Sequence, residues 1–190
     1  MKSTIKLVFA SIIIAVSIIA CNSQDAEKEA EIVNLKAQLA QIAKTNATIA
    51  ENLKTFDELD FEVYSNQDWK RLHESHSDDI LVHYPDGHTS KGIEDHIKEL
   101  DPMFVFAPDT RIEEHPIKIG SGNITAVVGE LKGTFTEPMP IGNGEFIQPT
   151  GKSFKLPMST IGLWNEDGVM YEEYLFYDNQ AFLKQIGLAK

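Results

Sequence analysis

The segment from Asp25 to Phe56 contains neither glycine nor proline, and its apolar pattern constrains the fold more than any other feature of the chain. The apolar residues recur at alternating spacings of three and four, with Asn46 at one position of the series. They are Ile32, Leu35, Leu39, Ile42, Ile49, Leu53 and Phe56. Such a heptad pattern is typical of a helix with one apolar stripe. We therefore predict a helical stalk over residues 21–56, about 37 Å long between Ile32 and Phe56 at 1.5 Å per residue.

Two interpretations of this stalk remain open at the level of sequence. In the first, two or three copies form a coiled coil, Asn46 fixes the register, and the protein is a homo-oligomer. In the second, a single amphipathic helix packs on its own domain or spaces that domain from a membrane.

The first residues have the order of a secretory signal. Met1 to Lys6 is short and basic, Leu7 to Ile19 is almost entirely apolar, and the sequence becomes polar after Cys21. The apolar run is short for a spanning helix of about 20 residues. Ile18-Ile19-Ala20-Cys21 resembles a bacterial lipobox, which implies a signal peptide over residues 1–20 and acylation of Cys21. We therefore expect a lipid-anchored protein of the bacterial cell envelope, at the outer membrane or the periplasmic face.

Residues 57–190 have the size of one domain, and helical patterns precede strand patterns within them, which indicates the α+β class. We expect helices at 58–64, 69–76, 92–100 and 179–186, and strands at 80–84, 111–119, 124–135, 154–164 and 169–177. The stretch from Glu137 to Thr150 is rich in proline and glycine and is predicted to be a flexible loop.

Composition and motifs exclude several classes of function. The net charge of −12 argues against a nucleic-acid partner, because binding needs lysine and arginine to neutralise phosphates. The sole cysteine lies in the lipobox, so no internal disulfide forms and thiol catalysis has no candidate. Phosphate-binding glycine loops, dinucleotide fingerprints and Gly-x-Ser-x-Gly are all absent.

Four short motifs in a fixed order resemble the SnoaL-like polyketide cyclase and ester cyclase family, within the nuclear-transport-factor-2-like superfamily. They are His83-Tyr-Pro-Asp-Gly, Gly92-Ile-Glu, Pro149-Thr-Gly-Lys and the run from Asp167 to Asp178. The resemblance implies a cone, in which a curved antiparallel sheet wraps around N-terminal helices and encloses a pocket. It also implies ring closure or isomerisation of a small hydrophobic carbonyl compound by a pocket carboxylate, without metal or cofactor.

The last predicted strand supplies the candidate catalytic carboxylates. Alternation places Glu172, Tyr174, Phe176 and Asp178 on one face, and the resemblance favours this face as the inner one. A carboxylate among aromatic rings in a dry pocket would have a raised pKa and could exchange a proton with carbon. We therefore expect Glu172 and Asp178 to be catalytic, with His83 holding the enolate oxygen.

Further residues are candidates for substrate binding. They are His115, Tyr174, Phe176, Met103, Phe106 and Phe135. Met103 and Phe106 belong to an apolar segment between helix and sheet that could close the pocket mouth or simply pack in the core.

Metal binding and purely structural roles are the alternatives to cofactor-free catalysis. Five of the six histidines lie between His73 and His96, but their spacing does not predict three converging ligands, so no metal site is expected. The alternatives to an enzyme are a module that binds a small ligand without chemistry and an oligomeric scaffold.

Overall fold

The computed structural model describes residues 2–190, with side chains from Asp25 onward. Two compact units are present, Met1–Thr45 and Asn46–Lys190. The predicted signal peptide and Cys21 lie outside the residues whose side chains are described. Among the residues that the structure describes, no helix is both long enough and apolar enough to cross a membrane.

The chain begins with the long helix α1 (Lys2–Glu58), which passes into a π-helical turn, η1 (Leu59–Tyr64), and a 3-10 helix, η2 (Trp69–Glu74). The remaining helices are α2 (Ile93–Phe106) and α3 (Asn179–Gln185). The strands are β1 (His76–His83), β2 (Thr89–Lys91), β3 (Arg111–Ile112), β4 (Ile117–Ser121), β5 (Ile124–Thr134), β6 (Met139–Gly142), β7 (Glu145–Ile147), β8 (Ser153–Trp164) and β9 (Met170–Tyr177).

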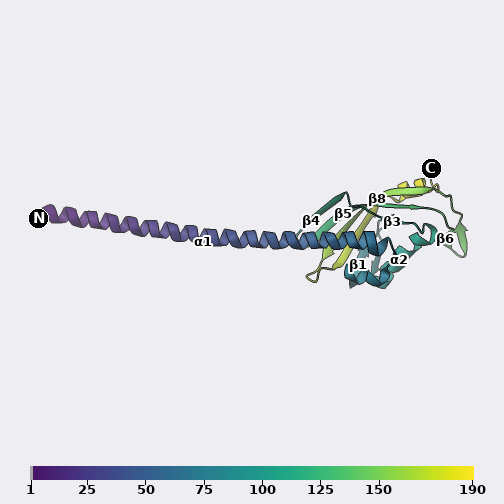
Figure 1. Cartoon of the computed structure of the whole chain (residues 1–190), viewed down its shortest axis with the longest axis horizontal. Coiled ribbons are helices and arrows are strands. Elements are labelled where there is room, and N and C mark those ends of the chain that lie inside the picture. The colour runs from purple at the N-terminus through teal and green to yellow at the C-terminus, as the bar shows by residue number, and fades with distance from the viewer. Residues whose placement is uncertain (1) are drawn as a thin grey trace. The chain divides into compact units, whose positions relative to one another are not determined.

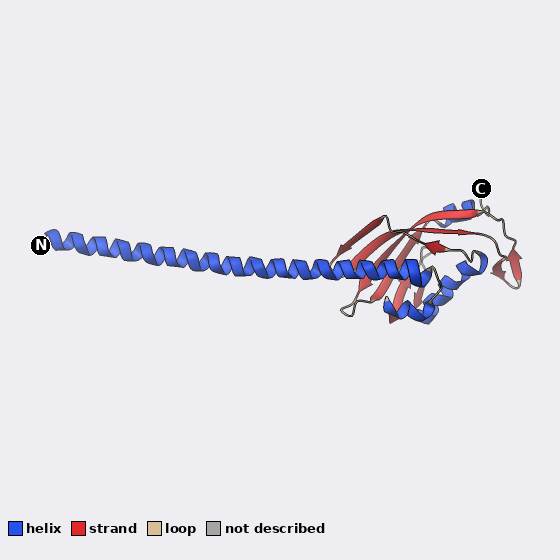
Figure 2. Ribbon diagram, in the orientation of Figure 1, coloured by secondary structure: helices blue, strands red, loops and turns tan. Residues whose placement is uncertain are grey.

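Seven strands form one curved sheet in the order β2-β1-β9-β8-β5-β3, with β4 also paired to β5 (Figures 1 and 2). The long strands β5, β8 and β9 are antiparallel neighbours. The pair β1 and β9 is parallel, so the sheet is mixed rather than wholly antiparallel. The predicted α+β class is confirmed. The predicted loop at Glu137–Thr150 contains the small β6–β7 hairpin.

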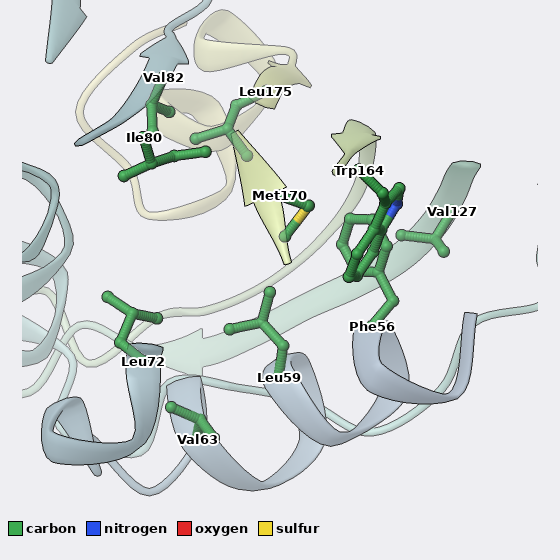
Figure 3. Close-up of a cluster of buried hydrophobic side chains, with 10 residues drawn as sticks. All are labelled: Phe56, Leu59, Val63, Leu72, Ile80, Val82, Val127, Trp164, Met170 and Leu175. Atoms are coloured by element: carbon green, nitrogen blue, oxygen red, sulfur yellow. The ribbon is translucent and has the colours of Figure 1, made fainter. Parts of the chain in front are cut away.

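The last turns of α1 and the turn η1 pack against the sheet through a first core cluster (Figure 3). Phe56 is fully buried, and its ring meets Trp164 of β8 edge-on at a centroid distance of 5.9 Å. The residues of the heptad series therefore differ in burial. Phe56 belongs to the domain core, whereas Leu39 remains 65% exposed.

Phe106 and Phe135 anchor a second core cluster beneath α3, with their rings edge-on at 5.6 Å. The helix α2 extends six residues beyond the predicted end at Leu100 because Pro102 is accommodated within it. Proline usually interrupts a helix since it lacks an amide hydrogen. Here Met103 and Phe106 consequently lie on the last turn of the helix and not in a segment between helix and sheet.

Irregular pairing decides which side chains of β9 face the interior. The register with β8 shifts between Leu163 and Trp164, and the register with β1 shifts between His76 and Leu81. Beyond these irregularities Glu173 and Leu175 are buried, whereas Glu172 and Phe176 are on the opposite face. The predicted inner face of β9 is therefore wrong.

Candidate functional site

The predicted residues Glu172, His83 and Tyr174 do meet, but on the outer face of the sheet. Oε1 of Glu172 accepts a hydrogen bond from the Tyr174 hydroxyl at 2.7 Å and lies 2.9 Å from Nε2 of His83. The imidazole of His83 stacks on the Tyr174 ring at a centroid distance of 4.1 Å. Parallel pairing of β1 and β9 places His83 directly beside Tyr174.

This outer cluster lacks the electrostatics expected of a buried proton carrier. Hydrogen bonds from Tyr174 and His83 hold the pKa of Glu172 below its ordinary value, although partial burial opposes them. The expectation was a raised pKa in a dry pocket. A solvated carboxylate stabilised as its anion is a weak base, so the geometry does not support Glu172 as the proton carrier.

The other predicted residues also divide between structural positions and the interior. Asp178 caps α3, since its Oδ1 accepts a hydrogen bond from the Ala181 amide at 2.9 Å. Phe176 is exposed, and Phe106 and Phe135 pack in the second core. Within the described residues, Met103 is the one predicted site residue that lines the interior cavity.

The interior contains a cavity of about 150 Å³ between the sheet, α2 and the η1 turn. Its wall is mostly apolar, with Leu59, Leu131 and Leu175 among its residues. The polar and titratable residues of the wall are Asp60, Tyr64, His76, Tyr84, His88, His96, Glu99, Thr160, Glu173 and Tyr177. A cavity in which apolar side chains surround convergent polar groups is the common form of a small-molecule site.

Asp60 is the carboxylate that lies in the buried, apolar environment expected of a proton carrier. It lies in the π-helical turn that follows α1, and its side chain is 10% exposed and lines the cavity. Burial raises the pKa of Asp60, and the nearby charge of Glu173 adds to that rise against the opposing effect of His115. A carboxyl with a raised pKa takes up a proton more readily than an ordinary carboxyl, which suits a group that must accept and then return one.

His115 holds this carboxylate in place. Its Nε2 lies 2.8 Å from Oδ2 of Asp60, and its Nδ1 lies 2.8 Å from Oδ1 of Asp57. Lys118 donates to the other oxygen of Asp57 at 2.7 Å. Although burial opposes the charged ring, the hydrogen bonds that His115 donates to Asp60 and Asp57 raise the pKa of His115. His115 is thus a positioning residue behind the cavity wall.

A second buried cluster lines the same cavity. Oε2 of Glu173 lies 3.5 Å from Nε2 of His76 and 3.6 Å from Nε2 of His96, and all three residues are almost fully buried. Burial lowers the pKa of His96 to about 4. Although burial opposes its charge, the two histidines hold the pKa of Glu173 below its ordinary value.

Tyrosine hydroxyls supply hydrogen-bond donors in the cavity. Burial raises the pKa values of Tyr64, Tyr84 and Tyr177, so their hydroxyls stay protonated across the physiological range. The Tyr84 hydroxyl lies 2.8 Å from Nδ1 of His96 and 3.0 Å from Oγ of Ser90. Protonated hydroxyls in an apolar cavity can stabilise a developing oxyanion.

Sequence reasoning missed Asp60, Glu173, His76 and His96. For Asp60 a signal was available, because it follows the buried Phe56 by four residues and precedes the buried Val63 by three, which is the spacing of one helical face. Glu173 lies on the face of β9 opposite to the one that the resemblance favours. The meeting of His76 with His96 depends on the packing of α2 against β1, which spacing alone does not reveal.

Comparison with known proteins agrees with this architecture. The model of the family SnoaL-like polyketide cyclase matches residues 46–186. A Jannaschia sp. CCS1 protein with a SnoaL-like polyketide cyclase assignment has a TM-score of 0.63 and 19% identity, over 74% of this chain and 94% of that one. IdmH of Streptomyces antibioticus, also assigned as a polyketide cyclase, has a TM-score of 0.60 and 21% identity, over 72% and 98%.

A Xanthomonas campestris protein with the same type of assignment has a TM-score of 0.62 and 13% identity, over 74% of this chain and 99% of that one. Comparison with curated proteins found no match. At these identities the solved structures show the fold, and the family model covers most of the chain. The chain therefore belongs to the SnoaL-like polyketide cyclase family.

Proposed function

We propose that the domain binds a small carbonyl compound in its cavity and catalyses an isomerase- or cyclase-type proton transfer, with Asp60 as the proton carrier. The observation that carries the proposal is the placement of Asp60, a buried carboxylate with a raised pKa that lines the cavity and is held by His115. Family membership supports the same reaction class.

The proposed reaction requires the residues of the cavity wall to remove a proton and to stabilise the enolate oxygen. Asp60 removes a proton from the carbon next to the carbonyl, and the electron pair of that C–H bond moves onto the carbonyl oxygen. The protonated tyrosines of the cavity donate hydrogen bonds to the resulting enolate oxygen. Return of the proton from Asp60 to a different carbon gives isomerisation. Attack of the enolate carbon on a second carbonyl closes a ring, and the alkoxide formed there takes the proton back from Asp60.

The cavity also limits the substrate. A cavity of about 150 Å³ matches the size that admits a ligand such as benzene. Its largely apolar wall favours an uncharged compound over an acid or a phosphate. We therefore propose a single-ring or short-chain ketone as the substrate class.

Deuterium exchange tests the role of Asp60 without knowledge of the natural substrate. The purified protein is incubated in D₂O with a panel of small cyclic and linear ketones, and deuterium at the carbon next to the carbonyl is followed by NMR. We expect catalysed exchange with at least one ketone and a loss of about 10²- to 10⁴-fold in Asp60→Asn, the usual contribution of acid–base catalysis. Ketone binding, measured by chemical-shift perturbation, should remain in that variant.

Glu172→Gln is the matched carboxylate change on the outer face and should exchange at the wild-type rate. Exchange that survives Asp60→Asn but disappears in Glu172→Gln would overturn the assignment. Ketone binding without any exchange in the wild type would favour the alternative function, a binding module without chemistry.

We also propose that the protein is a lipid-anchored component of the bacterial cell envelope, acylated at Cys21. The support is the order of basic, apolar and small residues before the sole cysteine of the chain. Because the net charge of −12 disfavours anionic lipid surfaces, attachment would depend on the acyl chains.

A further inference from the structure

We propose that His76, His96 and Glu173 form a binding site for a divalent transition-metal ion of the zinc class within the cavity. The three residues come from β1, α2 and β9, and their ligand atoms lie within 4.8 Å of one another. Two imidazoles and one carboxylate, with further positions open, are a common ligand set of catalytic zinc and of non-haem iron.

The two histidines are oriented as metal ligands usually are. Nδ1 of His76 lies 2.9 Å from Oγ of Ser75, and that hydroxyl donates its hydrogen to the Leu72 carbonyl at 3.2 Å. With the hydroxyl hydrogen directed at the Leu72 carbonyl, Nδ1 of His76 can donate to Oγ, and a neutral His76 ring then has the lone pair of Nε2 free to bind a cation beside Glu173. Nδ1 of His96 is likewise engaged, by the Tyr84 hydroxyl. Such outer partners fix the tautomer and the ring orientation of ligating histidines.

Two ligand atoms of this cluster are buried and unpartnered among the described residues. In the part of the chain that the structure describes, Nε2 of His76 and Oε2 of Glu173 are buried without a hydrogen-bond partner. Their separation of 3.5 Å is longer than a well-formed N–H···O bond. Buried polar groups of this kind are costly unless something satisfies them, and a cation between the three atoms would engage every one.

The site is also accessible and suitably charged. All three residues line the cavity, so a water molecule or a ligand oxygen can complete the coordination sphere. Asp60 and Glu99 contribute two more carboxyl groups to the same wall. An ion held there would polarise a carbonyl oxygen in the cavity. The metal site extends the proposed function and does not depend on it, because it rests on residues other than Asp60.

Metal binding to the full-length protein in detergent tests the proposal. The protein is treated with a chelator and dialysed, and Zn²⁺ is titrated by calorimetry, with bound metal then counted by elemental analysis. We expect one saturable Zn²⁺ per chain and a higher thermal midpoint in its presence, since a ligand that binds the folded state stabilises it. His96→Asn and Glu173→Gln should abolish both effects.

Two further variants test whether Zn²⁺ binding is specific to this site. Tyr84→Phe keeps all three ligands and should weaken Zn²⁺ binding about 10- to 100-fold through loss of the outer partner of His96. His73→Asn removes an exposed histidine whose Nδ1 faces the Lys70 carbonyl, and it should bind like the wild type. The proposal is overturned if the wild type lacks saturable binding, if folded His96→Asn or Tyr84→Phe binds as tightly as the wild type, or if His73→Asn is equally impaired.

A further variant separates Zn²⁺ binding from ketone exchange. Asp60→Asn should retain Zn²⁺ binding within a few-fold of the wild type while it loses ketone exchange. If Asp60→Asn loses ketone exchange but still binds Zn²⁺, the metal site is supported independently of the proton carrier. If the wild type catalyses exchange but binds no Zn²⁺, the assignment of Asp60 is retained and the metal site is rejected.

Discussion

At the scale of single residues, the environment separates carboxylates of the same chemistry. Asp60 and Glu172 each contact a histidine. Burial dominates at Asp60 and raises its pKa, whereas hydrogen bonds from Tyr174 and His83 dominate at Glu172 and lower its pKa. One carboxyl is prepared to exchange a proton, and the other is stabilised as an anion.

The charged ring of His115 makes a pH-dependent contribution to stability. A histidine whose pKa is raised in the folded state stabilises fully below its unfolded value of about 6.5, and that stability is lost as the pH rises through the raised folded value. Each unit of rise corresponds to about 1.4 kcal/mol. We expect the difference in unfolding free energy between wild type and His115→Gln to be largest near pH 6 and to shrink toward alkaline pH, as measured by urea unfolding.

His73→Gln serves as the surface control and should stay within about 0.5 kcal/mol of the wild type. A difference between wild type and His115→Gln that stays constant from pH 6 to pH 9, or grows with pH, would contradict a charged His115 between Asp57 and Asp60.

At the scale of elements, the sequence predicted the kind of structure better than its orientation. Periodicity and turn signals located β5, β8 and β9 to within a few residues of their observed bounds. Alternation could not reveal the inner face of β9, because carboxylates and aromatic rings occur on both faces. The register shift near Trp164 resolves that choice, because it interrupts the strict alternation that the sequence analysis assumes along β9.

The candidate site was harder to predict for the same reason. Met103 lines the cavity from the last turn of α2, and its role in substrate binding stays a prediction. Glu173 meets His76 and His96 only when β9 lies beside β1 in a parallel pair and α2 covers them. Parallel pairing joins strands that are distant along the chain, and no local pattern marks it.

Close packing of β8 against β9 gives a test of the core. A Cβ at Gly162 would collide with Sδ of Met170 and lie 3.2 Å from Cε2 of Phe56. Both neighbours are fully buried, so they have little room to move. We expect Gly162→Ala to destabilise the protein by about 1–3 kcal/mol in urea unfolding, the usual cost of overpacking. The exposed change Lys155→Ala on the same strand should cost less than about 1 kcal/mol, and equal effects would contradict this packing.

The exposed part of the heptad series favours self-association of the stalk. In the described chain, Leu35 and Leu39 are 49% and 65% exposed, and an apolar stripe in water is stabilised when another helix covers it. We expect the full-length protein to be larger than a monomer by sedimentation in detergent, and Leu35→Asp/Leu39→Asp to reduce it to a monomer. Ala37→Asp, off the stripe, should leave the assembly unchanged. A monomeric wild type would support the single-helix interpretation.

At the scale of the whole molecule, the proposed anchor determines where the cavity can act. A domain fixed to the envelope would meet small ketones in that compartment, outside the cytosolic setting of a polyketide pathway. The proposal predicts that the mature chain begins at Cys21 and carries acyl chains, each methylene of which adds about 0.8 kcal/mol of membrane affinity.

Substitution of the sole cysteine tests this prediction without disturbing a disulfide. We expect Cys21→Ser to move the protein from the membrane fraction to soluble fractions of the cell, and the wild type to resist washing with high salt because acyl chains, unlike ion pairs, are not screened. Mass spectrometry of the wild type should show an acylated N-terminal Cys21. Cys21→Ser protein that stays in the membrane with Met1 still present would indicate an uncleaved signal anchor, because the apolar run from Leu7 to Ile19 would then be the remaining means of attachment.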